Sequence, residues 1–236
     1  MQHPHDFQDT RTILFDLDGT LIDTTELILQ SFAHTWQSVC GYQHSRDALL
    51  STFGIPLREA MRKLLIEYPA ETEAIASTNF QDENGTVESL LATYRHFNFH
   101  NHDTIARPFA HTREVVSTLR ARGYRLGVVT SKGRELARRG LQLCSINEFI
   151  EEAVFLEDTT IHKPRPEPIL LALEKFKTEA RHAVYVGDSF HDMIAGRTAG
   201  VKTIAAAWGP MPRRELEREA PDFIAESMND LLEIFH

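Results

Sequence analysis

The chain of 236 residues is poor in cysteine, in basic residues and in long apolar runs. Its two cysteines, Cys40 and Cys144, are too few for a disulfide framework and lack the spacing of a metal site. The 25 Lys and Arg are outnumbered by 34 Asp and Glu, giving a net charge of −9, which argues against a basic nucleic-acid-binding surface. The longest apolar stretches, such as 204–208, are far shorter than the roughly 20 residues that span a bilayer.

Together these absences predict an enzyme of the cytoplasm. The first ten residues are polar and lack the apolar core of a signal peptide. We therefore expect a protein with reduced cysteines whose partners include neither nucleic acid nor membrane. The length allows one large domain or two modest ones without disulfide or metal staples. The oligomeric state stays open, because no sequence feature bears on it.

Short apolar runs bounded by polar turns alternate with helical stretches over much of the chain. Their Val and Ile content, without strict alternation, is typical of strands buried on both faces. We predict strands at 12–15, 125–129, 153–155, 183–186 and 203–206, helices at 133–143, 168–176 and 191–199, and a closing edge strand and helix at 222–225 and 229–235. This alternation predicts an α/β fold with a doubly wound parallel sheet, whose ligands bind at the carboxyl ends of the strands.

The segment between the first and second strands has a different pattern. Apolar residues there recur at helical spacing, as at Val87, Leu90, Leu91 and Tyr94. The segment is too long for a single crossover helix, so it predicts an all-helical cap domain inserted into the sheet domain. We place the catalytic core at 1–22 and 104–236, and the helical cap at 23–103.

An acidic pair follows the first predicted strand. Strand geometry points alternate residues to one face, so Asp16 and Asp18 are expected to be neighbours. Two adjacent carboxylates repel unless a cation, a proton or different roles separate them. A calcium loop is excluded, because Leu21 stands where its glycine belongs. For Asp16 to Gly19 alone, an ordinary turn stays a competing interpretation.

A second acidic pair follows the strand at 183–186. Gly187 allows a close turn, and Asp188 is expected to face the same crevice as Asp16. A serine-hydrolase elbow is disfavoured, because His191 stands where that motif has its second glycine. Asp192 is compatible with a simpler role at the start of the following helix.

Two further strand ends carry phosphate-binding chemistry. Thr130 can offer a hydroxyl, with backbone amides beside it, to a phosphate oxygen. Lys163 precedes a proline-rich turn that would hold it rigidly, although an isolated lysine is usually a solvated charge. Because all four junctions end strands of one predicted sheet, we expect a single site. Its acids would repel a phosphate, so a divalent cation and Lys163 must make the net charge of the site positive before a phosphate can bind.

This set of motifs resembles the haloacid dehalogenase (HAD) superfamily of phosphohydrolases. The family's four motifs are matched in order by 16–20, Thr130, Lys163 and 187–192, and an inserted helical cap marks its first cap class. The resemblance covers nearly the whole chain and is greatest to PpaX-type inorganic pyrophosphatases, over 14–32, 94–103 and 205–208. Phosphoglycolate phosphatases share the four motifs, so phosphoglycolate or another small phosphomonoester is the alternative substrate.

The resemblance implies Mg²⁺-dependent hydrolysis of pyrophosphate, a small anionic substrate, through an aspartyl-phosphate. Asp16 would be the nucleophile and Asp18 the general acid and base. The Mg²⁺ ligands would be Asp16, the Asp18 carbonyl and Asp188. Asp192 would support Lys163 or the waters on the metal. The residues implied to hold the phosphoryl group are Gly19, Thr130, Ser131 and Lys163, the last also countering the charge of Asp16.

The histidines of the predicted cap have a plain interpretation as exposed side chains: His96, His100 and His102. The functional alternative is that His102, with Arg58 or Arg62, contacts the distal phosphate of the substrate. A zinc site is disfavoured, because no metal-site spacing is present. Phe97 and Phe99 are expected in the core. Among other functions, a phosphomutase stays open, whereas a signalling receiver is disfavoured because receivers lack an inserted cap.

Overall fold

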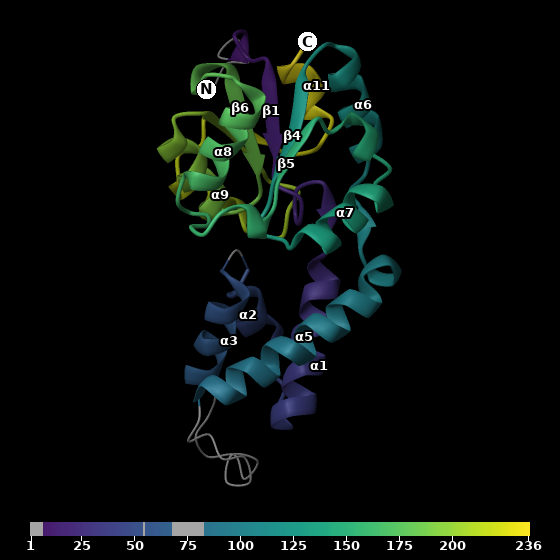
Figure 1. Ribbon diagram of the computed structural model, residues 1–236, viewed down its shortest axis with the longest axis vertical. Coiled ribbons are helices and arrows are strands. Elements are labelled where there is room, and N and C mark those ends of the chain that lie inside the picture. Colours follow the sequence, from purple (N-terminus) through teal and green to yellow (C-terminus); the bar gives the residue numbers. More distant parts are fainter. Residues whose placement is uncertain (1–6, 54, 68–82) are drawn as a thin grey trace. The chain divides into compact units, whose positions relative to one another are not determined.

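The computed structural model describes residues 7–53, 55–67 and 83–236 and divides the chain into two compact units (Figure 1). One unit comprises Met1–Thr24 with Ala106–His236, and the other comprises Thr25–Ile105. Each division lies two residues further along the chain than the predicted boundaries after residues 22 and 103. Residue 54 and residues 68–82 of the predicted cap lie outside the described residues.

The first unit contains a six-stranded parallel sheet in the order β5-β4-β1-β6-β7-β8. Its strands are β1 (Thr12–Phe15), β4 (Arg125–Val129), β5 (Glu152–Val154), β6 (Ala183–Gly187), β7 (Lys202–Ala206) and β8 (Phe223–Ala225). All were predicted, with end shifts of one residue at most, because continuous apolar runs mark buried strands reliably. The predicted α/β fold class with a parallel sheet is confirmed.

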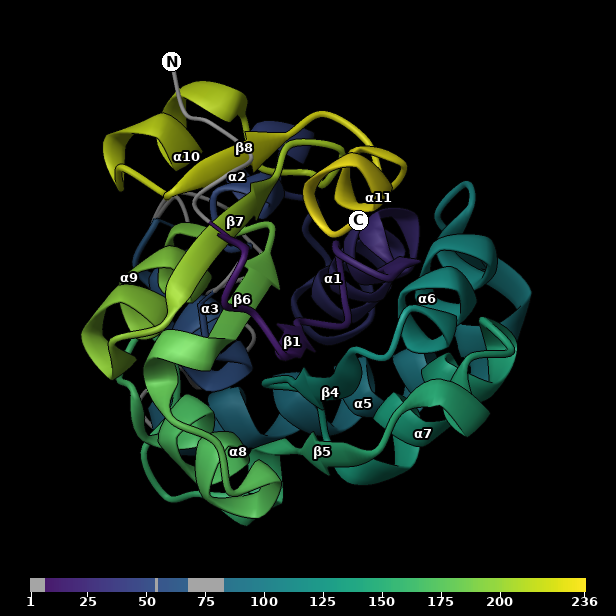
Figure 2. The same ribbon diagram turned by 90° about the horizontal axis from the view of Figure 1, so that it is seen from above.

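Helices cover both faces of this sheet, as the view in Figure 2 shows. On one side lie α8 (Glu167–Phe176) and α9 (Phe190–Ala199), and on the other α6 (Thr112–Ala121), α7 (Arg134–Leu143) and α11 (Asp230–Ile234). β1 and β6 are buried along their whole length, which explains why their residues do not alternate between apolar and polar. The remaining elements of this unit are β2 (Ile22–Asp23), β3 (Arg107–Pro108), η2 (Asn147–Phe149), η3 (Leu156–Asp158), η4 (Ala180–His182) and α10 (Arg213–Arg218).

The strand order creates one special position at the carboxyl edge of the sheet. The chain runs from β1 to β4 and β5 on one side, and then returns to β6, β7 and β8 on the other. The order therefore reverses beside β1, which pairs with both β4 and β6. Ligands of doubly wound sheets bind outside such a reversal. Asp16 follows β1 and Asp188 follows β6, so both acids stand at this position.

The described residues of the second unit form helices and no strand. These are α1 (Thr25–Cys40), α2 (Arg46–Leu50), α3 (Leu57–Ile66) and α5 (Glu83–Ile105). Their apolar faces share a core of its own that includes Trp36, Met61 and Leu90, all fully buried. Within the described ranges, no helix has the length and apolar character needed to cross a membrane.

Two side chains of α5 differ from expectation. His102, expected to be exposed, is completely buried, and its Nδ1 lies 2.7 Å from Oδ1 of Asp103. Phe99, expected in the core, is 36% exposed. The helical period explains both, because Tyr94, Asn98 and His102 share the buried face at four-residue spacing. Residue type suggested a buried phenylalanine and an exposed histidine, but the position of each residue on the helix determined which side chain is buried.

The other polar residues named for this unit have these positions. His96 and His100 are exposed, and their rings lie 4.1 Å apart on one face of α5. Arg58 pairs with Glu88 at 2.6 Å, within the same unit. Arg62 lies 3.4 Å from the side-chain oxygen of Asn84. The hypothesis that Arg58, Arg62 or His102 contacts substrate stays a prediction.

A pair of neighbouring residues on α8 tests the assigned core. Ile169 is fully buried against Leu14 and Tyr185, whereas Leu170 is 46% exposed. Ile169→Ala should lower the free energy of unfolding by about 2–5 kcal/mol, since it removes buried methyl groups and leaves a cavity. Leu170→Ala is the matched control and should change it by less than about 0.5 kcal/mol. Equal losses in urea denaturation would contradict the packing of α8.

Candidate active site

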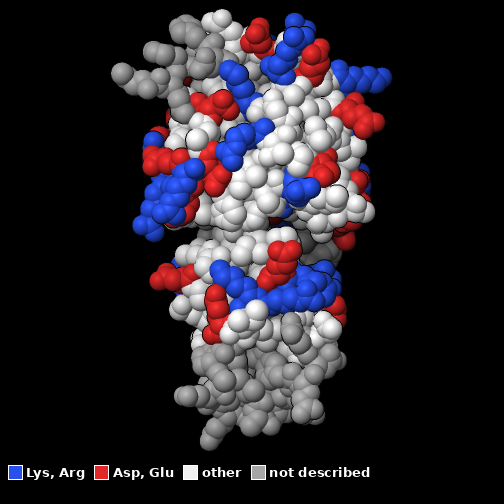
Figure 3. Space-filling view, turned by 90° about the vertical axis from the view of Figure 1, so that its left-hand side faces the viewer, with Lys and Arg blue, Asp and Glu red and all other residues white. Residues whose placement is uncertain are grey.

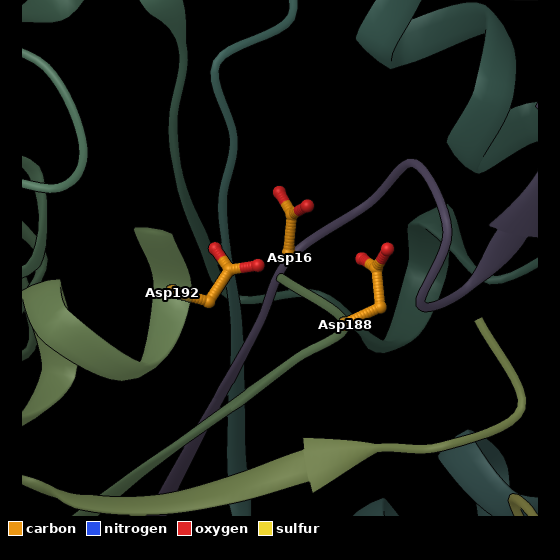
Figure 4. A group of neighbouring side chains, drawn as sticks. All are labelled: Asp16, Asp188 and Asp192. Atoms are coloured by element: carbon orange, nitrogen blue, oxygen red, sulfur yellow. The ribbon is translucent and has the colours of Figure 1, made fainter. Parts of the chain in front are cut away.

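Three buried carboxylates meet at the carboxyl edge of the sheet. Figure 4 shows Asp16, which follows β1, Asp188, which follows β6, and Asp192 of α9 gathered around one space. One oxygen of each lies within 4.8 Å of the others. The register explains the approach, because Phe15 pairs with Val186 and the Asp16 amide donates to the Val186 carbonyl at 2.8 Å. The structure thus brings together acids that are up to 176 positions apart in the sequence.

Lys163 is the cation at the centre of this cluster. Its Nζ lies 3.0 Å from Asp16 Oδ1 and 2.6 Å from Asp192 Oδ1, and it donates to the Tyr185 hydroxyl at 2.9 Å. The contacts with Asp192 and Tyr185 are hydrogen bonds, and the contact with Asp16 is an ion pair. The side chain is only 6% exposed. Burial would lower the pKa of Lys163, but Asp16 and Asp192 raise it above its ordinary value, so the charge is retained.

Asp192 has both oxygens occupied by protein donors. Its Oδ1 accepts from Lys163 and lies 3.0 Å from the Tyr185 hydroxyl, while Oδ2 accepts from the amide and hydroxyl of Ser189 at 3.0 and 2.6 Å. Burial would raise the pKa of Asp192, but Lys163, Ser189 and Tyr185 hold it below its ordinary value. Asp192 therefore caps α9 and also binds Lys163, so the two roles considered from the sequence are compatible.

Asp16 and Asp188 are compensated far less. Burial raises the pKa of Asp16 to about 7, against the opposing charge of Lys163, and the carboxylates of Asp192 and Asp18 add to the rise. Burial and the carboxylates of Asp192 and Asp16 raise the pKa of Asp188 well above its ordinary value. Ionising either of these two acids, which are 8% and 6% exposed, is therefore unfavourable unless a further cation binds beside them. Buried carboxylate oxygens gathered in this way are the kind of ligand that a hard divalent cation takes.

Asp188 is held by the loops that surround it. The Thr20 hydroxyl donates to Asp188 Oδ1 at 3.0 Å, and the Trp208 indole N–H donates to the Thr20 carbonyl at 2.9 Å. Gly19 has φ +81°, and a Cβ there would lie 2.3 Å from the Asp188 carboxylate. A Cβ on Gly209 would lie 2.4 Å from the Cβ of Asp188. Both glycines are needed because the backbone passes directly against this acid.

The loop after β4 contributes a second lysine. Lys132 Nζ lies 2.7 Å from Asp18 Oδ1, and the Lys132 amide donates to the Thr130 hydroxyl oxygen at 3.1 Å. Thr130 is 5% exposed and lies at the end of β4, as predicted, whereas Ser131 is exposed. Asp18, two residues after Asp16, is partly exposed: 26% of its side chain is accessible.

Three contributors to the site had no role in the sequence prediction: Tyr185, Trp208 and Lys132. Tyr185 could have been noticed as a hydroxyl within an otherwise apolar strand that is buried throughout. Lys132 stands two residues after Thr130, in a junction already identified. Trp208 follows β7, whose carboxyl end lies at the same edge of the sheet as the acids. In each case the partner is distant in sequence, so only the fold reveals the contact.

Known proteins resemble this chain over nearly its whole length. The model of the haloacid dehalogenase-like hydrolases matches residues 13–206. A pyrophosphatase PpaX from Bacillus cereus (strain B4264) is 38% identical over 223 residues, covering 94% of this chain and 95% of that protein. A pyrophosphatase PpaX from Bacillus thuringiensis (strain Al Hakam) is 36% identical over the same shares. The crystal structure of a predicted phosphoglycolate phosphatase from Haemophilus somnus 129pt has a TM-score of 0.83 at 23% identity, covering 97% and 99% of the two chains, and bears on the fold alone.

Asp188→Asn should stabilise the protein in the presence of a chelator at neutral pH. Because the folded state raises the pKa of Asp188, the unfolded state binds fewer protons, and stability falls as pH rises above the ordinary carboxyl range. Asparagine stays neutral and can still accept from Thr20. The difference in Tm between Asp188→Asn and the wild type should therefore grow from about pH 5 to about pH 8. Each kcal/mol added to the free energy of unfolding should raise the Tm by about 2–4 °C.

The exposed Asp9→Asn is the control for this experiment, and its Tm should follow the wild type across the same pH range. Added Mg²⁺ should raise the Tm of the wild type more than that of Asp188→Asn, because the variant has lost one carboxylate ligand. A Tm difference that stays constant with pH would contradict the electrostatic account of Asp188.

Proposed function

Because the chain belongs to the haloacid dehalogenase-like hydrolases, we propose that it hydrolyses inorganic pyrophosphate to two phosphates in a Mg²⁺-dependent reaction. The observation that carries the proposal is the unequal compensation of the acids. Lys163 and Ser189 occupy both oxygens of Asp192, while Asp16 and Asp188, each with an oxygen within 4.8 Å of it, keep raised pKa values at the reversal point of the sheet. The name of the PpaX relatives supports pyrophosphate as the substrate.

The Mg²⁺ ligands from the protein would be the carboxylates of Asp16 and Asp188 and the backbone carbonyl of Asp18. Bound there, Mg²⁺ supplies positive charge that offsets these carboxylates and attracts the phosphate oxygens. Asp192 would remain outside this set, because its oxygens already accept from Lys163 and Ser189. Its function would be to hold Lys163 beside Asp16, as a support for the reacting group.

In the first half of the reaction, a carboxylate oxygen of Asp16 attacks one phosphorus of pyrophosphate. A P–O bond forms to Asp16, and the bond from that phosphorus to the bridging oxygen breaks. The departing phosphate takes a proton from Asp18 as its bridging oxygen leaves. Lys163, 3.0 Å from Asp16, keeps the attacking carboxylate in place and offsets its charge.

In the second half, a water molecule attacks the phosphorus of the aspartyl-phosphate. Asp18 accepts the proton of that water, and the P–O bond to Asp16 breaks, which restores both carboxyl groups. The sum is pyrophosphate plus water giving two phosphates. Thr130 and the backbone around Gly19 and Ser131 would hold the transferring group by hydrogen bonds, in line between Asp16 and the leaving oxygen.

A substrate panel tests the proposal. The wild type should have its highest kcat/KM on pyrophosphate, compared with 2-phosphoglycolate and a hexose phosphate, and should lose activity with EDTA. A preference for 2-phosphoglycolate would replace the substrate while leaving the proposed chemistry of the acids in place. Formation of an isomeric hexose phosphate would instead indicate a phosphomutase.

Asp16→Asn should abolish turnover of every substrate in the panel, because an amide cannot form the phosphoryl ester. A fall below about one part in 10,000 is expected, by comparison with other removed nucleophiles. Circular dichroism and Tm check that the variant is folded. Turnover by a folded Asp16→Asn protein would remove Asp16 as the nucleophile.

Asp18→Asn should slow turnover by about 100- to 10,000-fold, the usual contribution of a general acid and base. Because the second half needs a base for water, aspartyl-phosphate should accumulate. Acid quenching after mixing with ³²P-labelled pyrophosphate should leave label on the Asp18→Asn protein and none on Asp16→Asn. Label on both variants, or on neither, would contradict the division of roles between the two acids.

A further inference from the structure

We infer that Lys132 binds the departing phosphate, and that it makes the enzyme selective for substrates whose leaving group carries negative charge. The inference rests on the proposed function and deepens it, since it assigns the substrate class to a particular side chain. It starts from the contact between Lys132 Nζ and Asp18 Oδ1, at 2.7 Å. Neither the motifs of the sequence nor the proposed chemistry gives this lysine a role.

The position of Asp18 fixes where the leaving group lies. A general acid must come within about 3 Å of the oxygen that it protonates. Lys132 Nζ lies 2.7 Å from Asp18 Oδ1, so it is within about 6 Å of the leaving oxygen when Oδ1 carries the proton, and within about 8 Å when Oδ2 does. The ammonium therefore stands at the leaving-group end of the substrate, whereas Lys163 stands beside the nucleophile Asp16.

The two lysines differ in what they can still bind. Lys163 Nζ already has three oxygen partners within 3.0 Å, on Asp16, Asp192 and Tyr185. In the described part of the chain, Lys132 Nζ contacts Asp18 alone, which leaves two N–H groups for a ligand. Its side chain is 10% exposed, so the ammonium is reachable but poorly screened by water.

The backbone of Lys132 is held on both sides. Its amide donates to the Thr130 hydroxyl oxygen at 3.1 Å, and its carbonyl accepts from the Leu156 amide at 3.1 Å. These bonds tie the residue to the end of β4 and the start of η3. The ammonium therefore approaches Asp18 from a rigid edge of the sheet. A charge held in place in this way can stabilise developing negative charge without first having to move.

The chemical consequence is a preference among leaving groups. When the bridging bond of pyrophosphate breaks, negative charge develops on the departing phosphate, and a nearby ammonium stabilises it. A phosphate ester of a neutral alcohol gives a leaving group with no further charge, so Lys132 contributes less to its departure. The leaving group of 2-phosphoglycolate carries one carboxylate and falls between the two cases.

The test compares Lys132→Met with Lys132→Arg on three substrates: pyrophosphate, 2-phosphoglycolate and glycerol 2-phosphate. Methionine keeps most of the chain length without the charge, and arginine keeps the charge. Lys132→Met should lose about 10- to 100-fold in kcat/KM on pyrophosphate, as expected for a lost hydrogen bond to a charged group. The loss should be smaller on 2-phosphoglycolate and smallest on glycerol 2-phosphate. Lys132→Arg should recover most of the pyrophosphate activity.

A binding measurement separates this role from simple positioning of Asp18. Imidodiphosphate, a pyrophosphate analogue that resists hydrolysis, should inhibit Lys132→Met with a Ki at least about 10-fold higher than the wild type. The Ki of inorganic phosphate, which fills the transferring position alone, should change less. Lys175→Met at the end of α8, where Lys175 pairs with Glu152 at 3.7 Å rather than with a residue of the site, is the matched control and should leave all these values unchanged.

The outcomes distinguish the inference from the proposed function. Equal losses on all three substrates, or no loss on pyrophosphate, would overturn the role of Lys132, as would an unchanged Ki for imidodiphosphate. A wild type that prefers 2-phosphoglycolate would overturn pyrophosphate as the substrate. The graded losses of Lys132→Met would still test the inference in that case, because glycolate is an anionic leaving group.

Discussion

The ammonium of Lys163, buried between Asp16 and Asp192, is the interaction on which the rest of the site depends. An unpaired buried carboxylate costs several kcal/mol, and one lysine here serves two of them. Asp188 lies in the same cluster but forms no ion pair with Lys163, whose charge lowers the pKa of Asp188 less than burial and the neighbouring carboxylates raise it. A divalent cation beside these acids would make their ionisation favourable.

The surface offers a contrast with this concentrated charge. On the face shown in Figure 3, basic side chains have acidic side chains beside them over much of the surface. Surface pairs of this kind, such as Arg197 with Glu219 at 3.1 Å, are worth little because water screens them. At the carboxyl edge of the sheet the acids are buried, so their repulsion is large. The sign of the net charge thus matters less than where the charges are buried.

Much of this arrangement could be predicted, for a physical reason. Buried parallel strands have continuous apolar runs, and the polar residues that follow them must meet at one edge, which identified Asp16, Thr130 and Asp188. Lys163 was expected at such a strand end too, but it lies in the segment between η3 and α8, beyond the end of β5 at Val154. The burial of His102 could not be predicted in this way, since it depends on which face of a long helix packs inward. The proposed task of Lys132 likewise follows from its contact with Asp18, across 114 positions of sequence.

By itself, the sequence determined the sheet, the inserted helical segment and the residue types at each strand end. Hydrophobic periodicity and turn residues can be recognised within short stretches of sequence, and these features depend on nothing else. Only the tertiary structure decided how charge is shared among these residues. The strand order brings β1 beside β6, and the distances that follow assign Lys163 to Asp16 and Asp192. Electrostatic energy depends on separation and burial in space, and neither quantity is contained in the spacing of residues along the chain.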